Sequence, residues 1–309
     1  MHRYIIKRIL LIIPVVFFVS FIIFWLLDLA PGDAAYIMAT DEMTDEEIEV
    51  LRETMGLNDP VFERYLRYIG GVLKGDLGTS IRSGAPVWDQ YIARFPTTAK
   101  LALASELVTV IIAIPLGILA ARKKDSWIDF GATTFNLLGL SIPNFWLGLL
   151  LILWFAVQRD WFPASGNEGW QSYVLPAIVI GTGHTAVLGR TTRSAMLDVL
   201  RQDYLRTARA KGCSERTVVN KHAFRNALIP ISTIFFNQLG GLFGGAVTTE
   251  AIFALPGVAQ MSVQAIRNND YAMVTGSSIM TTTIITSFVV VLDIFIAYID
   301  PRVKAQYSK

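Results

Sequence analysis

The stretch Asp203–Pro230, DYLRTARAKGCSERTVVNKHAFRNALIP, separates two long apolar runs in a chain of 309 residues. It holds six Lys/Arg and only two acidic residues. Tyr204–Lys211 has a helical pattern, Gly212 suits a left-handed helix end, and Ser214 suits the start of a second helix. The stretch therefore predicts a helix–turn–helix unit, called the basic hairpin below. Its small side chains, which would let another backbone approach closely, are Thr207, Ala208 and Ala210.

The apolar runs on both sides indicate a membrane protein. Hydrophobic residues make up 53% of the chain, charged residues only 17%, and the mean hydropathy is +0.46. A soluble chain of this length carries more charge, and a spanning helix needs about 20 mostly apolar residues. We therefore expect an all-α integral membrane protein with six transmembrane helices, of which the third and the last tilt or extend beyond the hydrocarbon. The expected spans are Ile9–Leu27, Leu101–Ala121, Ala132–Val157, Val174–Met196, Leu228–Thr249 and Met273–Ile299.

The basic residues predict the orientation. With the N-terminus in the cytoplasm, 18 of the 27 Lys/Arg residues fall in cytoplasmic segments, as the positive-inside rule requires. Both termini are then cytoplasmic, and the first apolar run is an uncleaved span, because it is longer than the apolar part of a signal peptide. The single Cys213 excludes an intrachain disulfide. The basic residues follow the membrane rule, so the lipid membrane is the expected partner and nucleic acid is not.

The outer loop between the first two spans is long enough to fold. Thr44–Glu47 is a capping box, Gly56 is a stop, and Asp59-Pro60 starts a second helix. Pro86 is expected to open a third, short helix. This helical cap either stabilises the first two spans or serves as a docking or gating surface. The expected divisions are 1–27 (first span), 28–96 (extracytoplasmic cap), 97–299 (core with five spans) and 300–309 (cytoplasmic tail).

A later outer loop, Glu250–Asp270, has a different pattern. Pro256-Gly257 predicts a turn, and Val258–Ile266 repeats apolar residues at helical spacing. The loop is too short to cross the membrane twice, so a surface or re-entrant helix is expected.

Several polar residues lie inside or at the edge of the spans. A charged acid such as Glu106 costs about 2.5–3.5 kcal/mol at mid-membrane. The candidates for a translocation path are Glu106, Asn144, Asn237 and Gln238. Hydrogen bonding between helices is the alternative for each, and Asp293 is expected to pair with a neighbouring helix. The glycines Gly240, Gly241, Gly244 and Gly245 favour close helix packing, or room for a wide substrate path.

No constellation for catalysis is present in the sequence. It contains no G-x-x-x-x-G-K-[ST], no H-E-x-x-H and no G-x-S-x-G, and its three histidines are scattered. We therefore expect no catalytic residues, no metal site and no cofactor in this chain, which is not predicted to be an enzyme.

The basic hairpin resembles the cytoplasmic coupling loop of ABC importer permeases, whose pattern is Glu-Ala-Ala, three residues, then Gly. Arg206-Thr207-Ala208 stands at the Glu-Ala-Ala position here, and Gly212 at the glycine. Where it departs from this general pattern, the basic hairpin resembles one branch of the family, the first permease subunit of dipeptide, oligopeptide and nickel importers. Seven further fragments of that branch occur in order: Leu29–Asp33, Gly75–Ser80, Ser141–Asn144, Arg190–Leu197, Glu250–Gly257, Asp270-Tyr271 and Asp300–Val303.

The resemblance implies a type I ABC importer permease fold in a bacterial or archaeal cell (inner) membrane. It implies a second homologous permease, two ABC ATPase subunits that bind ATP and Mg, and an extracytoplasmic substrate-binding protein. The coupling loop would be residues 198–227, and its ATPase-coupling residues Tyr204, Arg206, Thr207, Ala208, Ala210, Lys211 and Gly212. The implied cargo is short peptides, with nickel or another small solute as the alternative. A stand-alone ion-coupled secondary carrier is the rival class, and it would not need the basic hairpin.

Overall fold

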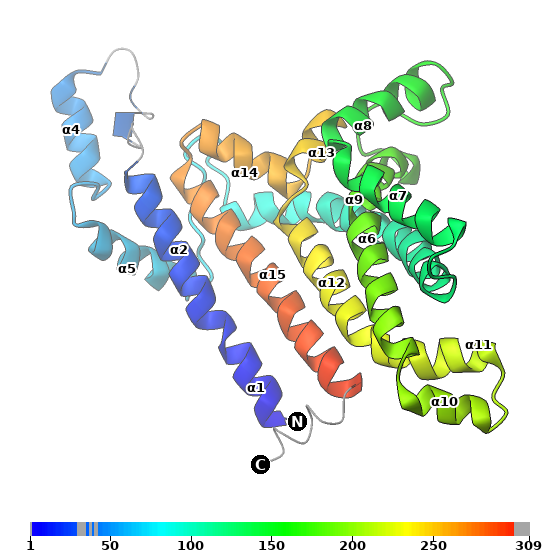
Figure 1. Cartoon of the computed structure of the whole chain (residues 1–309). Helices are drawn as coiled ribbons and strands as arrows, with labels where there is room; N and C mark the ends of the chain where they lie inside the picture. Colours follow the sequence, from blue (N-terminus) through cyan, green and yellow to red (C-terminus); the bar gives the residue numbers. More distant parts are fainter. Residues whose placement is uncertain (1, 30–34, 37–38, 40–42, 300–309) are drawn as a thin grey trace.

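The computed structural model describes residues 2–29, 35–36, 39 and 43–299 (Figure 1). The tail 300–309 and most of the fragment Leu29–Asp33 lie outside the described residues. Within the described part, the regular elements are helices, with one isolated bridge between Thr79 and Pro86. They are α1 (His2–Leu10), α2 (Ile12–Asp28), α4 (Asp45–Thr54), α5 (Val61–Val72), α6 (Val87–Arg122), α7 (Trp127–Ser141), α8 (Asn144–Leu151), η1 (Ile152–Val157), η2 (Trp170–Tyr173), α9 (Val174–Leu200), α10 (Asp203–Ala210), α11 (Glu215–Thr217), η3 (Val218–Ala223), α12 (Phe224–Gly244), α13 (Val247–Ile252), α14 (Val258–Arg267) and α15 (Tyr271–Ile299).

Among the described residues, five stretches of helix are long and apolar enough to cross a membrane, and a bent pair of helices makes a sixth if the pair is one span. The second and fourth spans pack most intimately, at Gly117 of α6. A Cβ added there would lie 2.6 Å from the Thr192 Cβ and 2.8 Å from the Gly189 carbonyl oxygen. The absence of a side chain at Gly117 therefore lets α6 and α9 approach each other closely.

The third span is bent, whereas the sequence predicted one helix over Ala132–Val157. α7 ends at Ser141, α8 begins at Asn144, and the two pieces meet at 97°. Pro143 lacks an N–H and disfavours helical backbone at the residue before it, and Ile142 is accordingly extended (ψ 119°). Only Ser141 and Asn144 interrupt the apolar composition near this point, which is why hydropathy alone predicts a single straight helix.

The fifth span also differs from its expected bounds, Leu228–Thr249. The helix continues from the basic hairpin without a break and ends at Gly244, because Gly245 has φ 120°. Val247–Thr249 belongs to the separate short helix α13. The helix expected over Val258–Ile266 is confirmed as α14.

Pro86 opens a helix, but not a short one. α6 starts at Val87 and runs for 36 residues through Pro96 and Pro115, so residue 96 lies inside a helix rather than at the end of the cap. In the cap, the Thr44–Glu47 capping box is confirmed: the Glu47 amide donates to Thr44 Oγ1, and the Thr44 amide donates to Glu47 Oε2. Asp59 does not cap α5, since its carboxylate is paired with Arg67.

The cap is anchored to the first span. Tyr65 of α5 is fully buried, and its hydroxyl donates to the Phe17 carbonyl at 2.8 Å and lies 2.9 Å from Ser20 Oγ. Phe17, Phe21 and Phe24 pack edge-on around the Tyr65 ring. The cap thus packs on α2 through an aromatic cluster with a satisfied polar centre.

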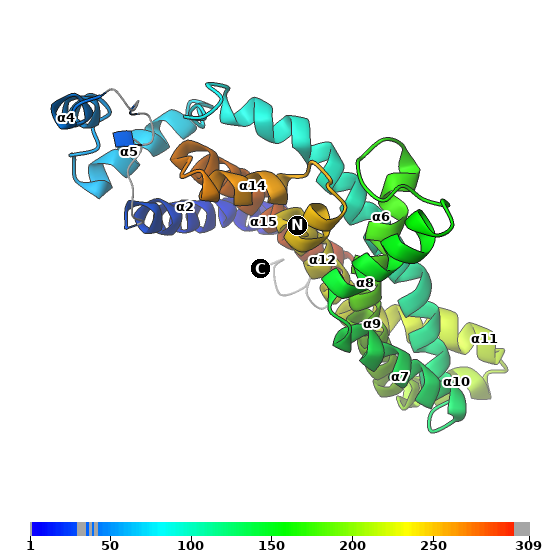
Figure 2. The same ribbon diagram turned by 90° about the horizontal axis from the view of Figure 1, so that it is seen from above.

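The two ends of the helix bundle are distinct. Figure 1 places the start of α1 and the end of α15 at the same end as α10 and α11, while α4, α8 and α14 lie at the opposite end. Seen from above in Figure 2, α4 and α5 lie beside α2, far from α7, α10 and α11. Which end faces the cytoplasm stays a prediction from the basic residues.

Candidate functional site

The turn of the basic hairpin has the predicted left-handed glycine. α10 ends at Ala210, and Gly212 has φ 81°. The Gly212 amide donates to the Arg209 carbonyl at 2.9 Å, and the Cys213 amide donates to the Ala208 carbonyl at 3.2 Å. This conformation costs a residue with a Cβ about 1–2 kcal/mol, so the joint favours glycine.

The second half of the hairpin is held by polar contacts. Ser214 accepts from the Thr217 amide, as the sequence predicted for its cap. Arg209 donates two hydrogen bonds to the Glu215 carboxylate, both 3.0 Å long, across the turn. Asn226 donates to the Tyr204 hydroxyl at 2.6 Å, which joins α10 to the base of the fifth span. These contacts make the hairpin one unit with α12.

One face of α10 is anchored and the other is open. Leu205 is fully buried among Val218, Ala223 and Ala227, in a cluster that also holds Leu188. Of the predicted ATPase-coupling residues, Ala208 is half-buried, and those that are exposed are Tyr204, Arg206, Thr207, Ala210, Lys211 and Gly212. The anchored face fixes the hairpin on the bundle, and the small and basic residues form a surface on its outer side.

A second feature is a pocket of about 400 Å³, open to the surface of the bundle and called the polar cavity below. Asn144 from the start of α8, His184 from α9, and Gln238 and Gly241 from α12 line it, together with Thr248 of α13. The break between α7 and α8 places Asn144 at this wall, and the end of α12 at Gly244 brings α13 to it. Two departures from straight spans thus build the cavity.

Glu106 lies one layer behind the polar cavity. Its Oε1 is 2.5 Å from His184 Nδ1, and the residue is only 2% exposed. Glu106 is therefore hydrogen-bonded to a neighbouring helix, as the alternative to a path residue required, and its partner is His184. His184 was not among the predicted site residues. A lone histidine 78 residues away along the chain gives no local signal of this contact. Gln238 Nε2 donates to the His184 carbonyl oxygen at 3.2 Å, which ties α12 to the same point.

The other polar and small residues of the spans separate into two groups. Asn237 is exposed and does not line the polar cavity. Gly240 and Gly244 face α15: an added Cβ would lie 3.3 Å from Phe288 Cβ and 3.0 Å from Ile285 Cδ1. The glycines on the polar cavity are Gly241 and Gly245.

Ion pairs join neighbouring spans. Arg193 of α9 donates two hydrogen bonds to Asp129 of α7, at 2.5 and 2.6 Å, and Asp129 is buried. The expected pairing of Asp293 is found with Arg8 of α1, whose Nη1 is 2.9 Å from its carboxylate. The second pair gives Asp293, an acid inside the sixth span, a cation within reach, which offsets part of the cost of burying it.

A buried carboxylate organises the outer loop. Glu250 of α13 is fully buried, and it accepts from Thr98 Oγ1 and from the Gln260 amide, each at 2.9 Å. Thr98 in turn accepts from the Val258 amide at the start of α14. Burial raises the pKa of the Glu250 carboxyl. The network fixes α13 and α14 on α6, and so fixes the α13 wall of the polar cavity.

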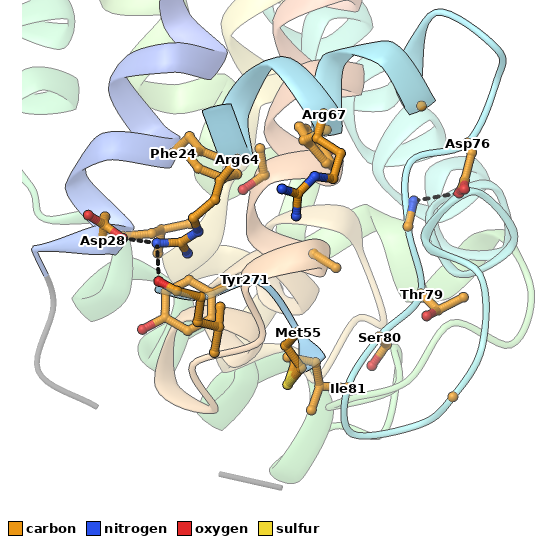
Figure 3. Close-up of a pocket in the computed structure, with 18 residues that line it drawn as sticks. Phe24, Asp28, Met55, Arg64, Arg67, Asp76, Thr79, Ser80, Ile81 and Tyr271 are labelled. Atoms are coloured by element: carbon orange, nitrogen blue, oxygen red, sulfur yellow. Dashed lines mark hydrogen bonds and ion pairs between the residues drawn. The ribbon is translucent and has the colours of Figure 1, made fainter. Parts of the chain in front are cut away.

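A further cavity of about 660 Å³ lies where the cap meets α2 and α15 (Figure 3). Arg64 donates to Asp28 at 2.5 Å, and the Gly78 amide donates to Asp76 at 2.8 Å. Figure 3 shows the Arg64 side chain directed toward Asp28. At its edge Ser80 donates to Asp270 at 2.5 Å, a buried contact across 190 residues. The cap is therefore tied to both the first and the last span.

Metal ligands do not gather in the described part of the chain. No group of three or more His, Cys, Asp or Glu residues with the geometry to hold an ion occurs among the described residues.

A bundle of apolar helices with an exposed hairpin at one end and an open polar pocket is the arrangement expected of a membrane transport subunit. Comparison with known families narrows the class. Residues 113–305 match the model of binding-protein-dependent transport system inner membrane components, and residues 1–102 match the N-terminal model of such membrane components. The chain belongs to this family of inner-membrane permease subunits.

Relatives cover the whole chain. It is 39% identical to the oligopeptide transport system permease protein AppB of Bacillus subtilis, over 98% of this chain and 100% of that protein. It is 38% identical to the glutathione transport system permease protein GsiC of Escherichia coli K12, over 98% and 99%. The structure resembles the inward-facing MetNI methionine ABC transporter with a TM-score of 0.51 and 18% identity, covering 70% of this chain and 95% of that one. This likeness concerns the fold, which is the ABC importer permease fold that the sequence predicted.

Proposed function

We propose that this chain is one of two permease subunits in an ATP-driven, binding-protein-dependent importer of short peptides. The similarity over 98% of the chain to permeases named for oligopeptides and glutathione supports short peptides as the cargo class, since oligopeptides and glutathione are both peptides. Two ABC ATPases with ATP and Mg, a second homologous permease and an extracytoplasmic binding protein complete the machine.

The basic hairpin is the proposed contact with an ATPase. Its outer surface is exposed and its inner face is anchored through Leu205, so a push on α10 passes into α12 rather than bending a loose loop. The continuous helix from Glu215 to Gly244 carries that displacement to the polar cavity, which Gln238 and Gly241 line. This arrangement connects an ATPase-driven movement to the proposed translocation path.

The polar cavity is the proposed part of that path in this chain. Asn144 and Gln238 line it directly, and Glu106 reaches it through His184. Asn237, outside the cavity, is left as a candidate for contact with the second permease.

The hairpin assignment is tested in the assembled importer in nanodiscs. Ala208→Glu adds a charge at the half-buried centre of the surface, and Gly212→Pro cannot adopt φ 81°, so both should reduce substrate-stimulated ATPase activity and uptake together. Gln158→Glu adds the same charge to an exposed site after η1 and should leave ATPase association unchanged. Full coupling in both hairpin variants would overturn the assignment.

The cargo is tested by uptake of a labelled tripeptide and of ⁶³Ni into proteoliposomes with the complete importer. Peptide uptake that requires ATP and the binding protein is expected. Nickel uptake alone would point to the alternative cargo. Uptake driven by an ion gradient without an ATPase would instead identify a secondary carrier.

A further inference from the structure

Helix α5 of the cap carries an apolar stripe that the described residues leave uncovered. Phe62, Leu66, Ile69 and Leu73 recur every three or four residues, which places them on one face of the helix. Phe62 is 54% exposed, Leu66 47% and Leu73 83%. Beside this stripe lies the covered face, where Tyr65 is fully buried against α2. The apolar surface of α5 is therefore wider than its contact with the first span.

The basic residues of α5 lie away from this stripe. Arg64 and Arg67 face the cavity between the cap and the last span, which the stripe does not line. The Arg64 guanidinium lies over the Phe24 ring, 5.7 Å from its centroid, and donates to Asp28 at the end of α2. An arginine that lays its stem along apolar side chains and carries its charge to the end of a span behaves as basic residues do at a membrane surface.

Helix α5 lies at the level of the first span, not beyond its end. The Tyr65 hydroxyl donates to the carbonyl of Phe17, which is about 16 Å from Asp28 along α2. The Phe62 and Phe21 ring centroids are 6.4 Å apart, and Phe21 is about 10 Å from the same end of α2. Figure 1 shows α5 beside α2, whereas α4 rises past the end of α2.

The length of the first span gives the depth of the stripe. The span Ile5–Asp28 has 24 residues and is about 36 Å long, against a hydrocarbon core of about 30 Å. Centred in the bilayer, its end at Asp28 stands about 3 Å outside the core, so Phe21 and the neighbouring Phe62 lie about 7 Å inside it. Amphipathic helices that lie in the plane of the interface bury their apolar face by about 5–10 Å.

The stripe is continuous with the face of α2 that meets lipid. Only 6% of the most apolar part of the first span is buried inside the described structure. Its uncovered face includes Phe18, 64% exposed, and Trp25, 46% exposed, and Phe21 lies between these residues and Phe62. A contiguous apolar patch of this kind is unfavourable in water, and lipid already covers its larger part.

We infer that α5 is an interfacial helix, and that its stripe of Phe62, Leu66 and Leu73 contacts the acyl chains of the leaflet at the cap end of the bundle. Lipid then holds one side of α5 and the Tyr65 contact holds the other, so the cap is attached to the membrane along α5 as well as through its connections to the spans. The inference rests on the membrane location of the family and is independent of the cargo.

The test is nitroxide labelling of the assembled importer in lipid nanodiscs, with Cys213→Ser and cysteine-free partner subunits. Leu66→Cys and Leu73→Cys report on the stripe. Collision rates with oxygen, which concentrates in the bilayer, and with water-soluble chromium oxalate give the depth of each label. At a depth of about 5–10 Å, the oxygen-to-chromium ratio at the stripe should be about threefold or more above that at exposed Glu46→Cys of α4, and close to that at Phe18→Cys of α2.

Glu63→Cys is the matched control on the same helix. Glu63 is exposed and lies about a quarter turn from the stripe, so its label should give a ratio nearer to that of Glu46→Cys. Leu73 is the most exposed residue of the stripe, so Leu73→Cys should assemble even if Leu66→Cys does not. Size-exclusion chromatography and ATPase activity check the assembly of each labelled complex.

The measurement is made with and without the binding protein, and three results would overturn the inference. Chromium access at Leu66 and Leu73 equal to that at Glu46 would leave the stripe in water. Low access to both reagents would mean that the second permease covers the stripe. Oxygen access that is lost on adding the binding protein would make the stripe a docking surface for that protein instead.

Discussion

The contact between Glu250 and Gly257 predicts a mutation that is harmful in one background and harmless in another. A Cβ added at Gly257 would lie 2.3 Å from Glu250 Cδ and 2.4 Å from each carboxylate oxygen. Gly257 has φ −94°, a conformation that alanine adopts freely, so the effect of Gly257→Ala comes from this clash alone. Overpacking of this kind costs about 1–3 kcal/mol.

Glu250→Ala acts through a different cost. It removes the acceptor of two donors, the buried Thr98 hydroxyl and the part-buried Gln260 amide. At about 1–3 kcal/mol for each unpaired donor, the loss is about 2–6 kcal/mol. It also removes all three atoms that an alanine at 257 would strike. The double variant should therefore be no less stable than Glu250→Ala alone, with a coupling of about 1–3 kcal/mol.

The assay is the apparent melting temperature of the assembled importer in detergent, at one fixed scan rate. At about 2–4 °C per kcal/mol, the coupling corresponds to about 2–12 °C of recovered melting temperature in the double variant. Gly70→Ala serves as the control, since nothing lies within 4 Å of its added Cβ. Strictly additive losses in the double variant would refute the contact on which the reasoning rests.

Three further predictions use the same measurement. Gly117→Ala should lower the melting temperature, because the added Cβ would lie 2.6 Å from the Thr192 Cβ. Gly131→Ala should not lower it, because the added Cβ meets open space and alanine gains up to about 1 kcal/mol in helix propensity. Equal effects of the two variants would contradict the α6–α9 contact. Ser80→Ala should cost about 1.5–3 kcal/mol by removing the bond to Asp270, whereas Ser287→Ala, whose hydroxyl bonds within its own helix, should cost less than a third of that. Burial raises the pKa of Glu250 above 4.5, so the folded protein holds the carboxyl proton more tightly than the unfolded chain does. The contribution of this proton to stability is therefore fully present below pH 4.5 and is lost as the pH rises through the raised pKa. The melting temperature of the wild type relative to Glu250→Gln should fall over that rise, and a pH-independent difference would exclude Glu250 as the cause.

Local rules predicted the parts of this structure that local geometry determines. Gly212, Ser214 and the Thr44–Glu47 box all follow from hydrogen bonds within a few residues. The six apolar segments could be predicted because a helix that crosses the membrane needs about 20 mostly apolar residues in a row. The sequence shows a proline at the bend, Pro143, but Pro115 lies inside α6 without ending that helix. A proline alone therefore does not predict where a helix breaks.

The contacts that organise the sites are long-range. Glu106 meets His184 across 78 residues, and Thr98 meets Glu250 across 152. Such pairs depend on how the spans pack, and one sequence carries no signal of that packing. The family fragments Gly75–Ser80 and Asp270-Tyr271 lie far apart in the sequence, and only the fold shows that Ser80 and Asp270 touch.

The elbow in the third span has a consequence for mapping topology. α7 has 15 residues and is about 22 Å long, which is less than the hydrocarbon thickness of about 30 Å, and the segment after the elbow is shorter still. Neither arm can cross alone: reporters fused before Trp127 and after Val157 would register one crossing if the bent pair is a broken span, and none if it is a re-entrant loop. A small label at Ile142 would instead lie at depth in the bilayer, shielded from reagents on both sides.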